Sequence, residues 1–313
     1  TKGKKTVKIK NIGKVKLDYS YYDPSYIYNE GDDVEDLILE TVKKTTDYKE
    51  YEQVIEKDSR WPVLYHLARQ RENIIAPMDI KETDCVLEIG AGMGAVTGAI
   101  ARRCKKVDCI ELSERRSLAN AYRNRNYDNI KIYVGNFQDI EIKEKYDVIT
   151  LVGVFEYAGY YISSDSPFID FLKNIKGMLK ENGKLYIAIE NKLGLKYFAG
   201  CAEDHLGKPF VGIEGYSKED HVQTFTKSQL EKMLTETGYN DIYFYYPYPD
   251  YKLPLEIYSD DCLPGKDAQF PTQVNYDINR LYLFDEKKVY ESLAGCEELK
   301  VLANSFLIEA VNV

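Results

Sequence analysis

The sequence has few of the residues and patterns that would allow a quick assignment. Its 313 residues include 3 His, 1 Trp and 6 Cys, and no two cysteines form a CxxC pair. The lack of such pairs argues against a zinc site or a dithiol redox motif, so we expect free thiols in a reducing cytoplasm. No apolar run approaches the ~20 residues that a helix needs to cross a bilayer, and we expect no signal peptide.

Positive charge is also scarce. Lys and Arg number 42 against 51 Asp and Glu, which gives a formal net charge of −9. Because a general nucleic-acid binder usually carries a basic footprint, we expect no nucleic-acid partner. Lysines nevertheless crowd the first sixteen residues. We interpret them as the solvated face of a hairpin, with contact to a membrane surface or a lipid-linked glycan as the alternative.

Strand and helix patterns alternate from Thr83 onward, which is typical of an α/β sheet. The pattern predicts strands at 85–90, 106–112, 130–135, 146–154, 184–190, 241–247 and 304–311. It predicts helices at 33–57, 59–75, 94–104, 113–125, 167–180 and 226–238. We therefore expect a hairpin and helical cap over 1–75, and one α/β domain over 76–313 with insertions at about 192–222 and 249–300.

A glycine-rich turn follows the first of these α/β strands. Gly90, Gly92 and Gly94 allow the backbone to bend sharply and to approach a ligand closely, and an acidic residue, Glu111, ends the next strand. This spacing fits a dinucleotide such as NAD as well as another nucleoside cofactor. Glu88 argues against NAD, because a carboxylate buried inside the strand needs a cationic partner.

Four motifs in order resemble class I S-adenosylmethionine-dependent methyltransferases. They are 86–94, 109–112, 134–137 and 146–157. The resemblance implies a Rossmann-like sheet of seven strands, the last antiparallel, with S-adenosylmethionine as cofactor. It implies that Glu111 binds the ribose hydroxyls, and that Asn136 and Phe137 lie beside the adenine. The expected cofactor-binding residues are Glu88, Gly90, Ala91, Gly92, Gly94, Glu111, Leu112, Asn136, Phe137 and Val152.

Later segments resemble bacterial methyltransferases associated with glycosyltransferases of surface-polysaccharide biosynthesis. They are 190–200, 203–205 and 212–216, together with 60–67 and 246–254. The resemblance implies O-methylation of a glycan or an activated sugar, with a glycosyltransferase as a partner. Two alternatives stay open: a small-molecule methyltransferase of secondary metabolism, and a catalytically inactive cofactor-binding domain that supports a glycosyltransferase.

Three residues are candidates for the catalytic site. His205 lies in the 192–222 insertion and is the first candidate for the base, and Glu156 follows the fourth strand of the α/β pattern and is the second. Glu214 is expected to orient His205 or to bind a sugar hydroxyl. His66 and His221 are expected in structural positions. No His, Asp or Glu cluster has clear metal-ligand spacing, so we expect no metal, although Asp165, Asp260 and Asp261 leave some room for one.

Overall fold

The computed structural model describes residues 8–26, 30–217, 219–271 and 280–313. The chain divides into two compact units, Thr1–Thr150 and Leu151–Val313. The predicted domain boundary near residue 75 falls inside the first unit and stays a prediction. Val7 and Tyr28, which belong to the predicted N-terminal hairpin and arm, lie outside the described residues.

The first unit is built on a mostly parallel sheet with the strand order β1-β2-β5-β4-β3-β6. Its strands are β1 (Ile9–Ile12), β2 (Val15–Tyr21), β3 (Cys85–Ile89), β4 (Lys106–Glu111), β5 (Ile130–Gly135) and β6 (Tyr146–Val152), which ends in the second unit. The hairpin β1–β2 forms as predicted, and β2 also pairs in parallel with β5, so that Leu17 faces Ile132. This second pairing was not foreseen.

Capping side chains and glycines determine where helices of the first unit begin and end. They are α1 (Asp32–Lys44), α2 (Tyr48–Lys57), α3 (Trp61–Leu67), η1 (Arg69–Ile75), α4 (Thr97–Ala101), α5 (Glu114–Arg123) and η2 (Phe137–Asp139). The helix predicted over 33–57 is two helices, because the Asp47 side chain accepts the Lys49 backbone N–H and starts a new helix. Helix α4 begins after Gly94, whose φ of 75° is incompatible with a right-handed helix.

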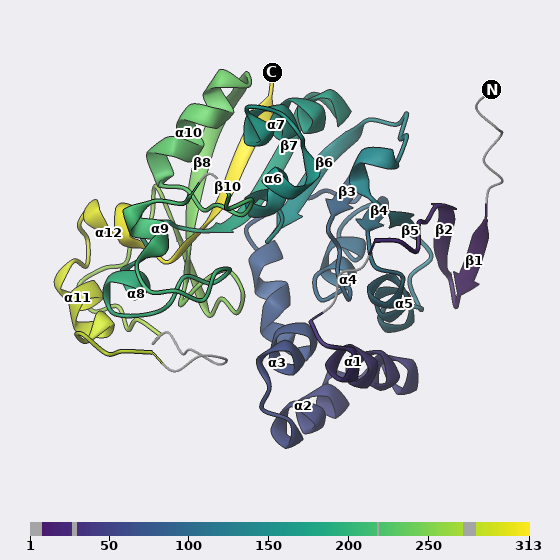
Figure 1. The fold of residues 1–313 in the computed structure, drawn as a ribbon, viewed down its shortest axis with the longest axis horizontal. Coiled ribbons are helices and arrows are strands. Elements are labelled where there is room, and N and C mark those ends of the chain that lie inside the picture. Colours follow the sequence, from purple (N-terminus) through teal and green to yellow (C-terminus); the bar gives the residue numbers. More distant parts are fainter. Residues whose placement is uncertain (1–7, 27–29, 218, 272–279) are drawn as a thin grey trace. The chain divides into compact units, whose positions relative to one another are not determined.

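The three N-terminal helices share one apolar core. Figure 1 shows α1, α2 and α3 lying together, and Ile38, Val42, Tyr51 and Val63 are buried between them. Burying four such side chains contributes roughly 1.5–3 kcal/mol each relative to exposure. This helical cap was predicted, although not its division into separate helices.

The second unit holds an antiparallel sheet with the order β7-β10-β8-β9. Its strands are β7 (Leu179–Glu190), β8 (Tyr239–Tyr248), β9 (Glu256–Ser259) and β10 (Ser305–Asn312). The last strand, β10, lies between β7 and β8 and is antiparallel to both, as predicted (Figure 1). The helical segments are η3 (Phe155–Tyr157), α6 (Ala158–Tyr161), α7 (Pro167–Met178), α8 (Leu195–Phe198), α9 (Val211–Glu214), α10 (Lys227–Glu236), α11 (Glu286–Ser292) and α12 (Glu298–Leu302).

The α/β class with a mostly parallel sheet is confirmed, but the predicted number of seven strands is wrong. The described residues form ten strands. The additional strands are β1, β2 and β9, and β1–β2 joins the sheet because β5 would otherwise have an open edge. Among the described helices, none combines the length and the apolar character that crossing a bilayer requires.

Candidate functional site

The glycine-rich turn of the first unit is held against strand β4. The backbone N–H groups of Gly90 and Ala91 both donate to the carbonyl of Ile110, at 2.9 and 3.1 Å. A Cβ at Gly94 would lie 2.5 Å from Asn120 Oδ1, so only glycine fits there. A Cβ at Gly92 would meet nothing within 4 Å, so the turn has open space on that side. The turn can therefore admit a ligand close to its backbone.

Glu88 is buried inside β3, as its predicted role requires. Thr97 Oγ1 donates to its Oε2 at 2.7 Å, and Asn120 in turn donates to Thr97 Oγ1 at 3.0 Å. Burial outweighs these bonds and raises the pKa of Glu88 to about 7. Such a carboxylate gains from a cationic partner, and the ammonium group of S-adenosylmethionine would be one.

Glu111 ends β4 with its carboxylate turned to the glycine-rich turn. Its Oε2 accepts the Gly92 N–H and its Oε1 accepts the Ser113 N–H, both at 2.8 Å. Burial raises its pKa, although the charge of Arg116 opposes the shift. A carboxylate oxygen has lone pairs left for a ribose hydroxyl, so Glu111, Glu88 and the open side of Gly92 together fit the predicted cofactor.

The other expected cofactor residues are less distinctive. Asn136 begins the short helix η2, where its side chain accepts the Gln138 N–H at 3.3 Å, and Phe137 beside it is half-buried. Leu112 is half-buried directly after β4, and Val152 is half-buried at the end of β6. Their roles in cofactor binding stay predictions.

In the second unit, His205 is surrounded by carboxylates. Its Nδ1 lies 2.9 Å from Glu203 Oε1, and its Nε2 lies 3.8 Å from Glu156 Oε1 and 3.9 Å from Glu190 Oε2. The side chains of Glu156 and Glu190 are 1% and 0% exposed, and that of His205 is 8% exposed. We call Glu156, Glu190, Glu203 and His205 the His205 cluster.

The side chains of the His205 cluster have pKa values that are shifted in different directions. Burial alone would lower the pKa of His205, but the charges of Glu190 and Glu156, and the hydrogen bonds that its ring N–H groups donate to Glu156 and Glu203, raise it well above 6.5. Burial raises the pKa of Glu156. At Glu190 burial acts in the same direction, but the ammonium of Lys252 prevails and lowers the pKa. The cluster therefore holds both charge and protons away from water.

Two lysines support the cluster from one side. Lys252 Nζ contacts Glu190 Oε1 and lies 2.7 Å from Asp204 Oδ1. Lys196 Nζ lies 2.8 Å from Asp204 Oδ2 and 3.7 Å from Asp250 Oδ2. The sequence reasoning missed the two lysines and Glu190. Glu190 was detectable, because it is a polar residue at the end of a predicted strand, as Glu111 is.

The remaining histidines and Glu214 lie elsewhere. Glu203, not Glu214, bonds to the His205 ring, and Glu214 is exposed on α9, so a catalytic role for Glu214 stays a prediction without a contact to His205. His66 is buried, and its Nε2 lies 2.8 Å from Glu30 Oε2. His221 is exposed and lies beside the ring of Tyr160. Both fit the structural positions expected for them.

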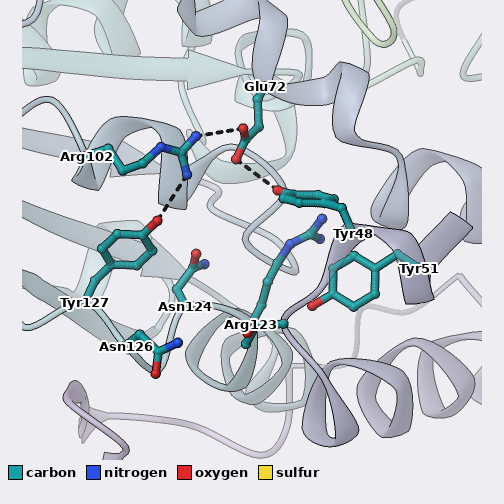
Figure 2. A pocket seen from close by; sticks show the side chains of 9 residues that line it. Tyr48, Tyr51, Glu72, Arg102, Arg123, Asn124, Asn126 and Tyr127 are labelled. Carbon is teal, nitrogen blue, oxygen red and sulfur yellow. Dashed lines mark hydrogen bonds and ion pairs between the residues drawn. The ribbon is translucent and has the colours of Figure 1, made fainter.

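A small cavity of ≈ 120 Å³ opens in the first unit, and one of its lining residues, Asn124, donates to the carbonyl of Gly94 at 3.4 Å. Figure 2 shows Glu72 at its side, with Oε2 bonded to Arg102 at 2.7 Å and Oε1 accepting the Tyr48 hydroxyl at 2.9 Å. Arg102 also donates to the Tyr127 hydroxyl at 3.1 Å. Glu72 thus links η1 to α2 and to the end of α4, so its role in these contacts is structural.

Comparison with known proteins identifies the family. The family described as methyltransferase domain matches residues 63–243, more than half of the chain. A ribosomal RNA small subunit methyltransferase A of Fusobacterium nucleatum is 23% identical over 198 residues, which are 62% of this chain and 66% of that protein. The protein of the same name from Ligilactobacillus salivarius is 36% identical over 61 residues, 20% of this chain and 21% of its own length.

The sequence identity to solved structures is lower than that to the two ribosomal RNA methyltransferases. The N-methyltransferase NodS of Bradyrhizobium japonicum, solved with S-adenosylhomocysteine, has a TM-score of 0.43 and 14% identity, covering 85% of this chain and 98% of NodS. The chain spans two thirds or less of the two ribosomal RNA methyltransferases named above. The predicted enzyme class and cofactor are confirmed, and the chain belongs to the methyltransferase domain family, whose methyl donor is S-adenosylmethionine.

Proposed function

We propose that this chain transfers a methyl group from S-adenosylmethionine to an oxygen of its acceptor, and that the His205 cluster takes up the proton of the acceptor hydroxyl. When bound, the cofactor supplies an electrophilic methyl carbon on sulfur. The observation that carries the proposal is Glu156, whose Oε1 lies 3.8 Å from His205 Nε2 and whose Oε2 is buried without a hydrogen-bond partner. Such an oxygen is ready to accept a proton or a hydrogen bond.

The acceptor is a separate question, and one exclusion from the sequence must be corrected. We expected no nucleic-acid partner on the basis of net charge, and this is wrong, because several relatives are named ribosomal RNA methyltransferases. Net charge describes the whole surface and leaves room for RNA at one site. Ribosomal RNA is therefore the first acceptor to test.

The finer predictions from the sequence have gained no support. The names of the relatives do not indicate a glycan, an activated sugar or a glycosyltransferase partner. O-methylation of a sugar and association with polysaccharide biosynthesis stay predictions, as do a small-molecule acceptor and the inactive-domain alternative. An acceptor assay separates them.

The assay measures transfer of labelled methyl from S-adenosylmethionine to small-subunit ribosomal RNA, to a bacterial polysaccharide and to a small-molecule extract. Label on an oxygen of any acceptor is the expected result. Binding of S-adenosylhomocysteine with no transfer to any acceptor would favour the inactive domain and overturn the proposal. Label on nitrogen alone would keep the enzyme class but reject the oxygen acceptor.

Substitution within the cluster tests the assigned residues. Glu156→Gln and His205→Gln should each lower kcat by about 10²-fold or more, since general acid–base groups contribute that much. Both variants should bind S-adenosylhomocysteine with unchanged affinity, because neither residue is an expected cofactor ligand. An unchanged kcat in both variants would remove the cluster from the reaction.

A further inference from the structure

Three atoms that commonly bind metals converge in the second unit. One carboxylate oxygen each from Glu156 and Glu190 and one ring nitrogen of His205 lie within 4.8 Å of one another. His205 Nε2 is 3.8 Å from the nearer oxygen of Glu156 and 3.9 Å from that of Glu190. A four-coordinate ion with bonds of about 2.1 Å holds its ligand atoms about 3.4 Å apart. For all three to share one ion, the two distances from His205 would each have to shorten by about half an ångström, and the distance between the two carboxylate oxygens by up to about 1.4 Å.

Two of the carboxylates each have one oxygen that accepts no hydrogen bond. Glu156 Oε2 and Glu190 Oε2 are buried and have no hydrogen-bond partner. A buried carboxylate oxygen without a partner is costly, and each such atom in a native protein calls for an explanation. Of the two, Glu190 Oε2 faces His205 Nε2 directly, whereas Glu156 has its Oε1 nearest to that nitrogen and its Oε2 still free of hydrogen bonds.

The His205 ring is oriented as in many metal sites. Its Nδ1 bonds to Glu203 Oε1, and Glu203 Oε2 accepts the backbone N–H groups of His205 and Leu206 at 2.8 and 2.7 Å. The Tyr216 hydroxyl also donates to Glu203 Oε1, at 3.1 Å. A carboxylate on one ring nitrogen fixes the tautomer and turns the other nitrogen toward the metal.

Charge favours a cation over a neutral ligand. The carboxylates around His205 and the lysines are those of Glu156, Glu190, Glu203, Asp204 and Asp250, and they face the ammonium groups of Lys196 and Lys252. Even a protonated imidazole leaves this group with a net negative charge. Unbalanced charge in a buried site is expensive, and a divalent ion would neutralise it.

We propose that Glu156, Glu190 and His205 bind a divalent cation, Mn²⁺ or Zn²⁺, with Glu203 as the positioning residue. One imidazole and two carboxylates suit these ions, whereas Mg²⁺ prefers oxygen ligands alone. A metal ion there would lower the pKa of a hydroxyl bound to it, which gives one route by which the cluster activates an acceptor. The site itself does not depend on methyl transfer.

The test titrates the chelator-treated full chain with MnCl₂ and with ZnSO₄, and follows binding by calorimetry and by the increase in Tm. One ion per chain and a raised Tm are expected, with MgCl₂ giving a weaker response at equal concentration. The absence of binding by both Mn²⁺ and Zn²⁺ at millimolar concentration would overturn the proposal, and this reading needs no variant.

Variants then locate the ion. Glu156→Gln should weaken binding of the preferred ion by at least about 10-fold, and Glu203→Gln by about 10–100-fold, the range typical for residues behind a metal ligand. Glu298→Gln, an exposed residue of α12, is the control with the same change of charge and should bind as wild type. Equal affinity in all three variants would place the ion elsewhere and reject the site.

Failure of the ion site and failure of the proposed function give different results. Ion binding without methyl transfer to any acceptor would keep the site and reject the function. Methyl transfer that persists after chelation, in a chain that binds neither Mn²⁺ nor Zn²⁺, would keep the function and reject the site.

Discussion

Among individual side chains, Glu88 carries a charge that depends on pH near neutrality. Burial raises its pKa to about 7, from 4.5 in an unperturbed glutamate. If the ionised form holds the cofactor ammonium, about one molecule in ten is competent at pH 6 and about nine in ten at pH 8. S-adenosylhomocysteine should therefore bind about 10-fold more weakly at pH 6 than at pH 8, as measured by calorimetry. Glu88→Gln should bind weakly with a flat profile, and an equally steep profile in this variant would exclude Glu88 as the cause.

The same shift predicts how the free protein responds to pH. Between about pH 4.5 and 7 the folded chain binds more protons at Glu88 than the unfolded chain does. The contribution of Glu88 to the free energy of unfolding therefore falls as pH rises through this window. Urea unfolding of wild type and Glu88→Gln at pH 5.5 and 7.5 measures it. Relative to wild type, the free energy of unfolding of Glu88→Gln should be higher at pH 7.5 than at pH 5.5.

Gly153 controls the approach of Tyr251 to the His205 cluster. Its φ is 69°, and a Cβ would lie 2.8 Å from the Tyr251 hydroxyl, which itself donates to Glu190 Oε1 at 3.3 Å. Gly153→Ala should lower the free energy of unfolding by about 1–2 kcal/mol, since a left-handed backbone is strained for alanine. It should also lower kcat by displacing Tyr251.

Gly177→Ala is a matched control for that prediction. Gly177 lies in α7, and a Cβ there would meet nothing within 4 Å. Alanine should be neutral or stabilise the protein by about 0.4–1 kcal/mol, because it restricts the unfolded chain. Equal unfolding free energies for the two variants would contradict a strained, crowded Gly153.

Among the helices, the cap of the first unit depends on one carboxylate that joins separate elements. Glu72 in η1 bonds to Tyr48 of α2 and to Arg102 at the end of α4. Glu72→Ala should lower the free energy of unfolding by about 1–3 kcal/mol, since the Tyr48 hydroxyl loses this acceptor and Arg102 keeps only its bond to Tyr127. Glu52→Ala, at an exposed position of α2, is the control and should change it little. Similar losses in both variants would deny Glu72 this role.

The strands show where sequence patterns were sufficient. The β3–turn–α4 order and Glu111 at the end of β4 followed from local patterns, because glycines and strand ends mark themselves in the sequence. The pairing of β2 with β5 did not follow, since their paired residues lie more than 100 positions apart. β9 was missed because it is only four half-buried residues inside a predicted insertion.

For the protein as a whole, the sequence could identify the cofactor but only part of the His205 cluster. Glu88 and Glu111 belong to motifs with fixed spacing, so a role in cofactor binding could be proposed for them from the sequence, and that role stays a prediction. Lys252 lies 62 positions after Glu190, and no local pattern links the two. The net charge led to the wrong exclusion of a nucleic-acid partner, because a charge summed over the whole chain says nothing about one binding surface.

The pairing of β2 with β5 has a consequence for synthesis. Strand β2 ends at Tyr21, but its parallel partner begins only at Ile130, so the early strand must wait while more than 100 residues are made. During that interval the edge of β2 that later pairs with β5 has no partner strand, and unpaired strand edges tend to associate with other chains. Because charged side chains oppose such association, we expect the alternating lysines of this segment, Lys8, Lys10, Lys14 and Lys16, to limit it in the nascent chain as well as in the folded protein.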